Sequence, residues 1–599
     1  MARSRPVPLL VATLVSVVAI IGVKAVLSRG GDAAVPVAGQ PSGPCVTLAV
    51  TASSEKAALL TRIAMDWSRT PASVAGRCAR VKVTSKASGG AAEALGRGWD
   101  EALDGPRPDV WSPASTTWTG LLQQRTAARD APDLVGAVRP PSIAQTPLVI
   151  AMPKPLAEAL GWPDKKIGWA DISALAADPA GWGRLGKPYG AFKLGKTNPH
   201  VSTSGLNATI GAYVAATQRS SDLTLADLAD PAVNAYVKTV ESSVVHYGDT
   251  TLTFLANLQR ADDAGQGLTY VSAVAVEEKS VYDYDTGNPS GDPATVGRHG
   301  PARTPLVAIY PKEGTLLSDN PYAVLAGPWV DDGKRAVAAA FLAHLQSAPV
   351  QGLFTAAGFR DATGRPGVVI NRASGTLPEQ PEVVLGAPSP AVLAGVQAAW
   401  DQQRKRARLL LVIDVSGSMG EPVGSAGASK LDLAKRAAAT AVDQLAPDDQ
   451  VSLWVFSTGQ DGTLPYRKVV PFGTAKDVLA PVRAAIGGLQ PGGGTGLYAT
   501  VRAANRALSD SADPSRINAV VVLTDGRNEY PADNRIQSLV DELDAEDPTA
   551  TVRVFPIAYG DDADLGELKK IAEASRGAAY DASDPATIDR VFTAVLSNF

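Results

Sequence analysis

The most regular pattern of apolar and polar positions lies in residues 408–599. Within it, Leu-Leu-Leu-Val-Ile at 409–413 is a continuous apolar run, typical of a central parallel strand that is buried on both faces. Further strands are predicted at 450–456, 519–523 and 552–558, and helices at 430–445 and 475–486. This alternation of strand and helix predicts a doubly wound, Rossmann-like α/β domain.

The preceding region, residues 45–376, alternates short apolar runs with helical patterns, which also predicts an α/β fold. Two of its segments are alike, Thr-Pro-Leu-Val-Ile-Ala-Met-Pro-Lys at 146–154 and Thr-Pro-Leu-Val-Ala-Ile-Tyr-Pro-Lys at 304–312. Such a pair is typical of a two-lobed protein in which the chain crosses to a second lobe and returns. The alternative is two core strands that are similar by chance. Residues 377–407 are interpreted as a linker and a connecting helix.

The amino terminus has the pattern of a targeting segment. Arg3 and Arg5 precede an apolar run at 7–23, about 17 residues long and at the lower limit for a membrane span. We interpret residues 1–30 as an uncleaved single-pass anchor that leaves the bulk of the chain outside the cell. Residues 31–44, rich in Gly, Ala and Pro, are interpreted as a flexible stalk. A cleaved signal peptide, which would make the protein secreted, is the alternative.

Composition narrows the class of function. A net charge of -4 disfavours nucleic acid as a partner. The sequence contains two cysteines, Cys45 and Cys78. If the protein is exported, we expect them to form a disulfide with each other. The alternative is two free buried cysteines. Residues 190–197 match the phosphate-loop pattern GxxxxGK[ST], but the following Asn198-Pro199 opposes the helix that such a loop needs. We therefore expect no ATP site and no enzyme.

Short segments rich in Ser and Thr precede predicted helices, such as the one at 206–216. Hydroxyls and free backbone N–H groups at helix N-termini can bind anions and polar solutes. The segments at 108–115 and 197–205, the turn at 310–315 and the ending at 351–360 together resemble the extracellular solute-binding proteins of bacterial transport systems. That resemblance implies two lobes with a small-molecule solute bound between them. The candidate cleft residues are Ser53, Ser54, Ser112, Ser115, Ser202, Thr203 and Ser204.

The apolar run at 409–413 ends in Asp-Val-Ser-Gly-Ser, which places two hydroxyls and a carboxylate around one small space. Hard oxygen ligands of this kind suit Mg²⁺, Mn²⁺ or Ca²⁺. With the Thr of a Gly-rich loop and a later Thr-Asp-Gly, the pattern resembles the metal-ion-dependent adhesion site of von Willebrand factor type A (VWA) domains. The five matching residues are Asp414, Ser416, Ser418, Thr495 and Asp525.

This second resemblance implies a divalent cation, most simply Mg²⁺, with an open position for a carboxylate from a partner protein. It implies direct metal contact by the three hydroxyl residues and mainly water-mediated contact by the two aspartates. The alternative is a Ser/Gly turn without metal, which would leave the two aspartates close together and unpaired.

These features predict a membrane-anchored extracellular binding and adhesion protein. A solute-binding-like region at 45–376 would be followed by a VWA domain at 408–599 that binds a partner protein through its metal. The alternative is the substrate-binding component of an ABC-type importer, whose VWA domain docks a permease or another envelope partner.

Overall fold

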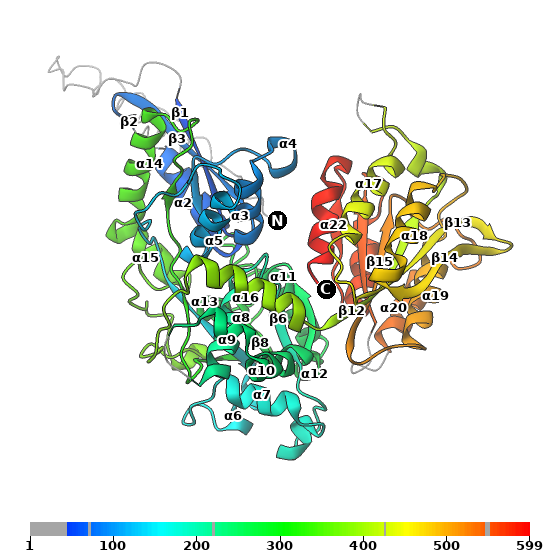
Figure 1. The fold of residues 1–599 in the computed structure, drawn as a ribbon, viewed down its shortest axis with the longest axis horizontal. Helices are drawn as coiled ribbons and strands as arrows, with labels where there is room; N and C mark the ends of the chain where they lie inside the picture. Colours follow the sequence, from blue (N-terminus) through cyan, green and yellow to red (C-terminus); the bar gives the residue numbers. More distant parts are fainter. Residues whose placement is uncertain (1–44, 70–72, 219–221, 424–426, 546–551) are drawn as a thin grey trace, which may run out of the picture.

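The computed structural model describes residues 45–69, 73–218, 222–423, 427–545 and 552–599. In Figure 1 the described residues form two stacked lobes, the first mainly blue and the second cyan and green, with a third α/β unit, yellow to red, beside them. The expected anchor at 1–30 and stalk at 31–44 lie outside the described residues. Among the helices that are described, none is both long enough and apolar enough to cross a membrane.

The first lobe is built on a sheet with the strand order β11-β4-β1-β3-β2, in which β1 pairs in parallel with β3 and β4. Its strands are β1 (Val46–Ala52), β2 (Ser73–Val74), β3 (Arg77–Ser85), β4 (Val110–Ser112) and β11 (Ala323–Val324). Its helices include α2 (Ser54–Arg69), α3 (Ser88–Arg97), α5 (Thr116–Ala127), α14 (Asp332–Leu345) and α15 (Ala348–Ala356). The expected disulfide is present, because Cys45 at the start of β1 is bonded to Cys78 in β3.

The second lobe contains a sheet with the order β10-β5-β8-β6-β7, and β9 also pairs with β5. Its strands are β5 (Thr146–Pro153), β6 (Leu194–Thr197), β7 (Val244–Gly248), β8 (Ala273–Glu277), β9 (Leu306–Ile309) and β10 (Leu317–Ser318). Its helices include α8 (Thr203–Thr217), α9 (Leu225–Ala229), α10 (Pro231–Ser242), α11 (Thr251–Asp263) and α13 (Glu278–Asp285).

The two similar segments of the sequence become β5 and β9, which pair antiparallel with Met152 opposite Val307. That the chain crosses between the lobes at these two segments remains a prediction. Helix α8 begins at Thr203, three residues before the expected start, because extended Ser202 occupies its N-cap position. Thr203 and Ser204 therefore lie in the first turn of the helix.

Helix α16 (Pro390–Gln403) leads into the third unit and packs against both lobes. On the first lobe, Gly120 of α5 lies against Pro390, where a Cβ atom would be 3.4 Å from the proline ring. On the second lobe, Gly395 lies against Leu228 of α9. The connecting helix therefore joins the third unit to both lobes.

The third unit has a sheet with the order β14-β13-β12-β15-β16-β17, and all neighbouring pairs are parallel except β13–β14. Its strands are β12 (Arg406–Asp414), β13 (Gln450–Asp461), β14 (Leu464–Thr474), β15 (Arg516–Thr524), β16 (Arg553–Tyr559) and β17 (Tyr580–Ala582). Its main helices are α17 (Lys430–Val442), α18 (Ala475–Gly487), α19 (Leu497–Ser509), α20 (Ile536–Asp544), α21 (Leu565–Ala574) and α22 (Ile588–Leu596).

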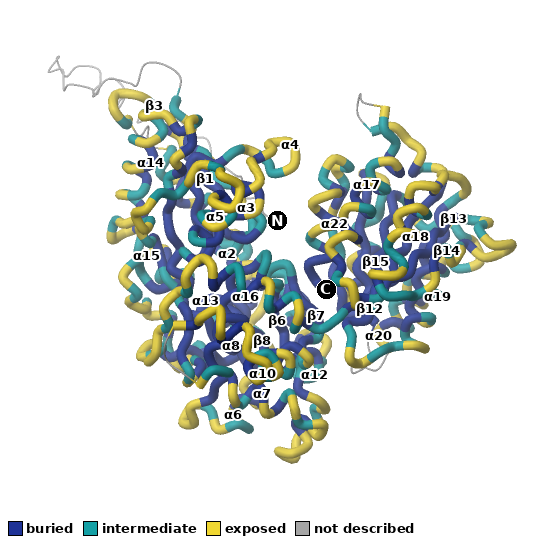
Figure 2. The backbone as a smooth tube through the Cα atoms, in the orientation of Figure 1, coloured by how far each residue is buried: buried dark blue, intermediate teal, exposed yellow. Residues whose placement is uncertain are grey.

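The central strand β12 stabilises this sheet because its apolar side chains are buried on both faces. Residues 409–413 are at most 1% exposed, and they alternate between one core with α17, α18 and α22 and another with α19, α20 and α21. Figure 2 shows the same buried interior between exposed helix faces. The expected fold class is confirmed. Strand β14 was not expected, because its two prolines and two basic residues obscure the strand pattern, and such residues are tolerated at a sheet edge.

The carboxyl terminus of the chain attaches the third unit to the second lobe. The backbone N–H of Tyr247 in β7 donates to the carbonyl of Asn598 at 2.9 Å, and the Asn198 amide donates to the carbonyl of Ser597 at 3.1 Å. Arg404 donates to the oxygen of Phe599 at 2.6 Å. The apolar core also continues from the second lobe through the connecting helix into the third unit.

Candidate metal centre and interlobe cleft

Asp414 ends the central strand β12, and its side chain is fully buried. One carboxylate oxygen accepts the backbone N–H of Ser416 at 2.8 Å, and the other accepts the hydroxyl of Thr524 at 2.6 Å. Both donors are neutral. Burial raises the pKa of Asp414 to about 7, against the hydrogen bonds that lower it and with a smaller contribution from the charge of Asp525.

The Ser418 hydroxyl, beside Asp414, lies in hydrogen-bond range of two other oxygen atoms. The hydroxyls of Ser416 and Ser418 are 3.1 Å apart, and the Ser418 hydroxyl donates to Oδ1 of Asp525 at 2.8 Å. Neighbouring ligands of an octahedral Mg²⁺ ion are about 3.0 Å apart, given bond lengths of roughly 2.1 Å. The two serine hydroxyls therefore already have the spacing of neighbouring ligands of one small ion.

The loop that carries Thr495 is held against the first loop by backbone hydrogen bonds. Gly417 donates to the carbonyl of Gly493, and Gly492 donates to the carbonyl of Val415, both at 2.8 Å. A Cβ atom at Gly526 would lie 2.8 Å from the Thr495 hydroxyl, so the glycine leaves the room that the hydroxyl needs. The structure thus brings together all five residues that the sequence predicted for this site.

A lysine that the sequence analysis did not single out also reaches the site. Lys430, the first residue of α17, donates to Oδ2 of Asp525 at 3.0 Å and to Glu421 at 2.8 Å. Its contact with Asp525 joins residues 95 positions apart, so only the tertiary structure could reveal it. Burial raises the pKa of Asp525, although the bonds from Ser418 and Lys430 oppose that effect.

Within the described part of the chain, no three His, Cys, Asp or Glu side chains converge as a metal-binding group. That finding is compatible with the cluster around Asp414, because three of its five side chains carry hydroxyls. Such a set contains only hard oxygen donors, the type preferred by Mg²⁺ and Mn²⁺.

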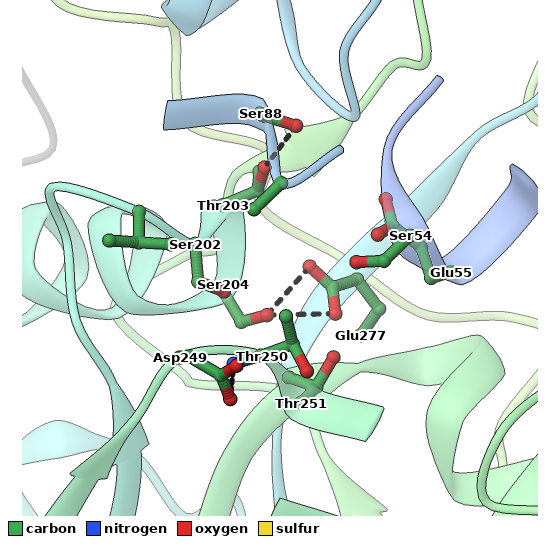
Figure 3. A pocket seen from close by; sticks show the side chains of 12 residues that line it. Ser54, Glu55, Ser88, Ser202, Thr203, Ser204, Asp249, Thr250, Thr251 and Glu277 are labelled. Carbon is green, nitrogen blue, oxygen red and sulfur yellow. Dashed lines mark hydrogen bonds between the residues drawn. The ribbon is translucent and has the colours of Figure 1, made fainter. Parts of the chain in front are cut away.

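A polar cleft lies between the two lobes, where helix N-termini from both lobes meet (Figure 3). The backbone N–H of Gly89 in α3 donates to the carbonyl of Val201 at 2.9 Å and so bridges the lobes. A Cβ atom at Gly89 would lie 2.0 Å from the carbonyl of His200, so only glycine permits this approach. The residues that line the cleft are Ser54, Glu55, Ala87, Ser88, Val201, Ser202, Thr203, Ser204, Asp249, Thr250, Thr251 and Glu277.

Carboxylates were the part of this cleft that the sequence analysis missed. Buried Glu277 ends β8 and accepts the hydroxyl of Ser204 at 2.9 Å. Its burial, together with the charge of Glu55, raises the pKa of Glu277 to about 7. Asp249 follows β7 directly. No local motif marks these acids. Glu277 and Asp249 lie at the ends of two strands of the second lobe, and Glu55 of the first lobe joins them where the two lobes meet.

Four of the seven predicted cleft residues line the cleft, namely Ser54, Ser202, Thr203 and Ser204. The other three have structural contacts instead. Ser53 accepts a hydrogen bond from buried Lys56, Ser112 accepts the N–H of Ser53 through its backbone, and Ser115 caps α5. These three face the interior because each lies at a tight strand-to-helix junction.

The two lobes, the cleft between them and the doubly wound third unit define a two-lobed binding protein that carries a VWA-type domain. Residues 48–360, more than half of the chain, match the family model of the bacterial extracellular solute-binding proteins, and the chain belongs to that family. Residues 409–528 match the model of the von Willebrand factor type A domain. An extracellular or periplasmic location accords with this family.

Solved structures resemble the two parts separately. A von Willebrand factor type A protein from Catenulispora acidiphila is 27% identical, with a TM-score of 0.27, over 32% of this chain and 42% of that one. A periplasmic thiamin-binding protein is 12% identical, with a TM-score of 0.39, over 61% of this chain and 99% of that one. The fructose-6-phosphate-bound periplasmic binding protein AfuA from Actinobacillus pleuropneumoniae is 14% identical, with a TM-score of 0.39, over 60% of this chain and 99% of that one. A search of curated proteins found no match.

Proposed function

We propose that this chain is a non-enzymatic, membrane-anchored extracellular protein that binds a solute between its lobes and a partner protein through a divalent metal. The cluster around Asp414 is the observation that carries this proposal. Ser416, Ser418 and Thr495 would hold the ion directly, and Asp414 and Asp525 mainly through water. When bound, the ion supplies an electrophilic position for a carboxylate of the partner.

Electrostatics supports a cation at this site. Asp414 is fully buried, and within the described residues it forms no ion pair with Lys or Arg. A buried carboxylate without a cation is costly unless it takes up a proton. A divalent ion would remove that cost, because metal binding favours the deprotonated carboxylate.

A pull-down from cell-envelope extract tests the adhesive function. We expect the wild-type chain to retain a partner in Mg²⁺ and to release it in EDTA, whereas Asp414→Ala retains nothing in either buffer. Capture that is equal in Mg²⁺ and EDTA would contradict a metal-mediated contact.

The cleft is the proposed solute site, supported by its hydroxyls, its carboxylates and its position between two lobes. In this closed arrangement it has room for about one water molecule, approximately 10 Å³. A solute larger than water therefore requires the lobes to separate before it enters.

Replacement of Ser202, Thr203 and Ser204 together by Ala is expected to abolish solute binding, because all three line the cleft and the Ser204 hydroxyl orients Glu277. The loss of unfolding free energy should be roughly 2–4 kcal/mol, since the buried Trp118 indole loses its acceptor on Thr203 and buried Glu277 loses the Ser204 hydroxyl. Calorimetry with a metabolite panel measures the first effect and urea unfolding the second.

The matched control is Ser242→Ala/Ser243→Ala, which removes two hydroxyls that bond only to backbone carbonyls near the end of α10. Solute affinity that survives the triple change would place the solute elsewhere. A solute that binds without any metal-dependent partner would favour the importer role instead.

A further inference from the structure

Lys430 connects the candidate metal site to charges around it. The two oxygens of Asp525 have different partners, since Oδ1 accepts the Ser418 hydroxyl and Oδ2 accepts the Lys430 ammonium group. The lysine side chain is 10% exposed, and its Cε atom lies 3.4 Å from the Cβ position that Gly560 lacks. The carboxylate of Asp525 therefore bridges the positive charge of Lys430 and the Ser418 hydroxyl.

The formal charges of the buried groups show how Lys430 changes the net charge of the candidate metal site. Asp414 and Asp525 contribute two negative charges, which a divalent ion alone would neutralise. The Lys430 ammonium group already offsets one of them. With the ion bound, the two aspartates, the lysine and the ion together carry one net positive charge.

We infer that Lys430 weakens intrinsic metal binding and leaves the loaded site one unit positive, so that a carboxylate from outside the chain completes it. This inference rests on the proposed metal-dependent function. Lys430 is then a positioning residue that acts through Asp525 and contacts neither the partner nor the ion. Its charge determines how strongly the loaded site favours an external carboxylate.

Two other acidic side chains, Glu421 and Asp562, also lie near Lys430 and contribute to the charge around it. Glu421 bonds to the ammonium group at 2.8 Å, and Asp562 lies 3.9 Å away. Their side chains are 56% and 76% exposed, so water and salt screen them far more than they screen buried Asp525. Glu421 is therefore held loosely and offsets little of the lysine charge at the metal site, whereas Asp525 is held from two sides.

Mn²⁺ titration calorimetry on the full chain tests the inference. We expect Lys430→Met, which keeps an unbranched side chain one atom shorter and removes the charge, to bind Mn²⁺ at least about tenfold more tightly than wild type. The reason is that an ammonium group repels a nearby divalent ion even at the dielectric constant of water. Lys430→Arg should bind like wild type, because it keeps the charge. Lys435→Met, the same charge change on α17, is the matched control.

Acetate is the probe for the external carboxylate. Saturating acetate should tighten Mn²⁺ binding to wild type and have a smaller effect on Lys430→Met, a difference that a purely structural role would not produce. Equal Mn²⁺ affinities in wild type, Lys430→Met and Lys435→Met would overturn the inference while leaving the metal site in place. If none of these proteins binds Mn²⁺, the proposed metal function fails together with the inference.

Discussion

Asp414→Ala is expected to eliminate divalent-metal binding to the full chain while leaving it folded. Asp414 is a buried carboxylate at the end of β12, whereas stability comes from the apolar strand residues before it. At a free Mg²⁺ concentration about 100 times the dissociation constant, wild type should gain roughly 2.7 kcal/mol in unfolding free energy by mass action. The variant should gain none, and its metal-free stability should change little, because removal of an unfavourably buried carboxylate offsets the loss of its two hydrogen bonds.

Thermal unfolding with and without Mg²⁺, repeated with Mn²⁺, measures both effects. Asp443→Ala is the control, since Asp443 lies just beyond α17 with a side chain that is 48% exposed. Equal metal-induced shifts in wild type and Asp414→Ala would refute the site, because nonspecific ion binding stabilises both proteins alike.

Glu241→Ala is expected to lower the unfolding free energy by about 3–5 kcal/mol, because it leaves a buried lysine without its partner. Glu241 is fully buried at the end of α10, and it forms an ion pair with Lys196, whose side chain is 2% exposed. It also accepts the hydroxyl of Tyr247 at 2.7 Å and the indole N–H of Trp400 at 3.1 Å. Urea unfolding followed by circular dichroism measures the loss.

The double variant Lys196→Met/Glu241→Leu separates the effect of an unpaired charge from that of lost packing. Apolar replacement of both ions commonly restores stability, so the double variant should be markedly more stable than Glu241→Ala. If Glu241→Ala costs less than about 1 kcal/mol, water reaches Lys196 and the pair is not sealed in the core.

The same variant should loosen the attachment of the VWA domain. Tyr247 accepts the backbone N–H of Lys405 at 3.0 Å and donates its own backbone N–H to Asn598 at 2.9 Å. Faster amide exchange in α22 of Glu241→Ala would reveal this loosening, since Tyr247 links the carboxylate to the carboxyl terminus.

The positions of candidate site residues that follow a strand directly could be predicted from the sequence. Asp414 and Asp525 follow continuous apolar runs, and the carboxyl ends of parallel strands meet at one edge of a sheet. The α/β class followed from such local patterns and the disulfide from export, whereas the five residues of the candidate metal site were predicted from the resemblance of their motifs to those of VWA domains. Ser202 was predicted for the same reason, because a hydroxyl before a helix is a local signal.

Only the tertiary structure decided which charges act on these residues. Lys430 reaches Asp525 across 95 positions, and Glu277 lines the cleft beside Ser204, which lies 73 positions away and donates to it. The attachment of Phe599 to Arg404 is likewise a contact between distant segments. Periodicity and motifs report the local environment of a residue, whereas electrostatic partners depend on where whole elements pack. The residues of the candidate metal site are therefore marked locally in the chain, whereas the fold determines the charge around them.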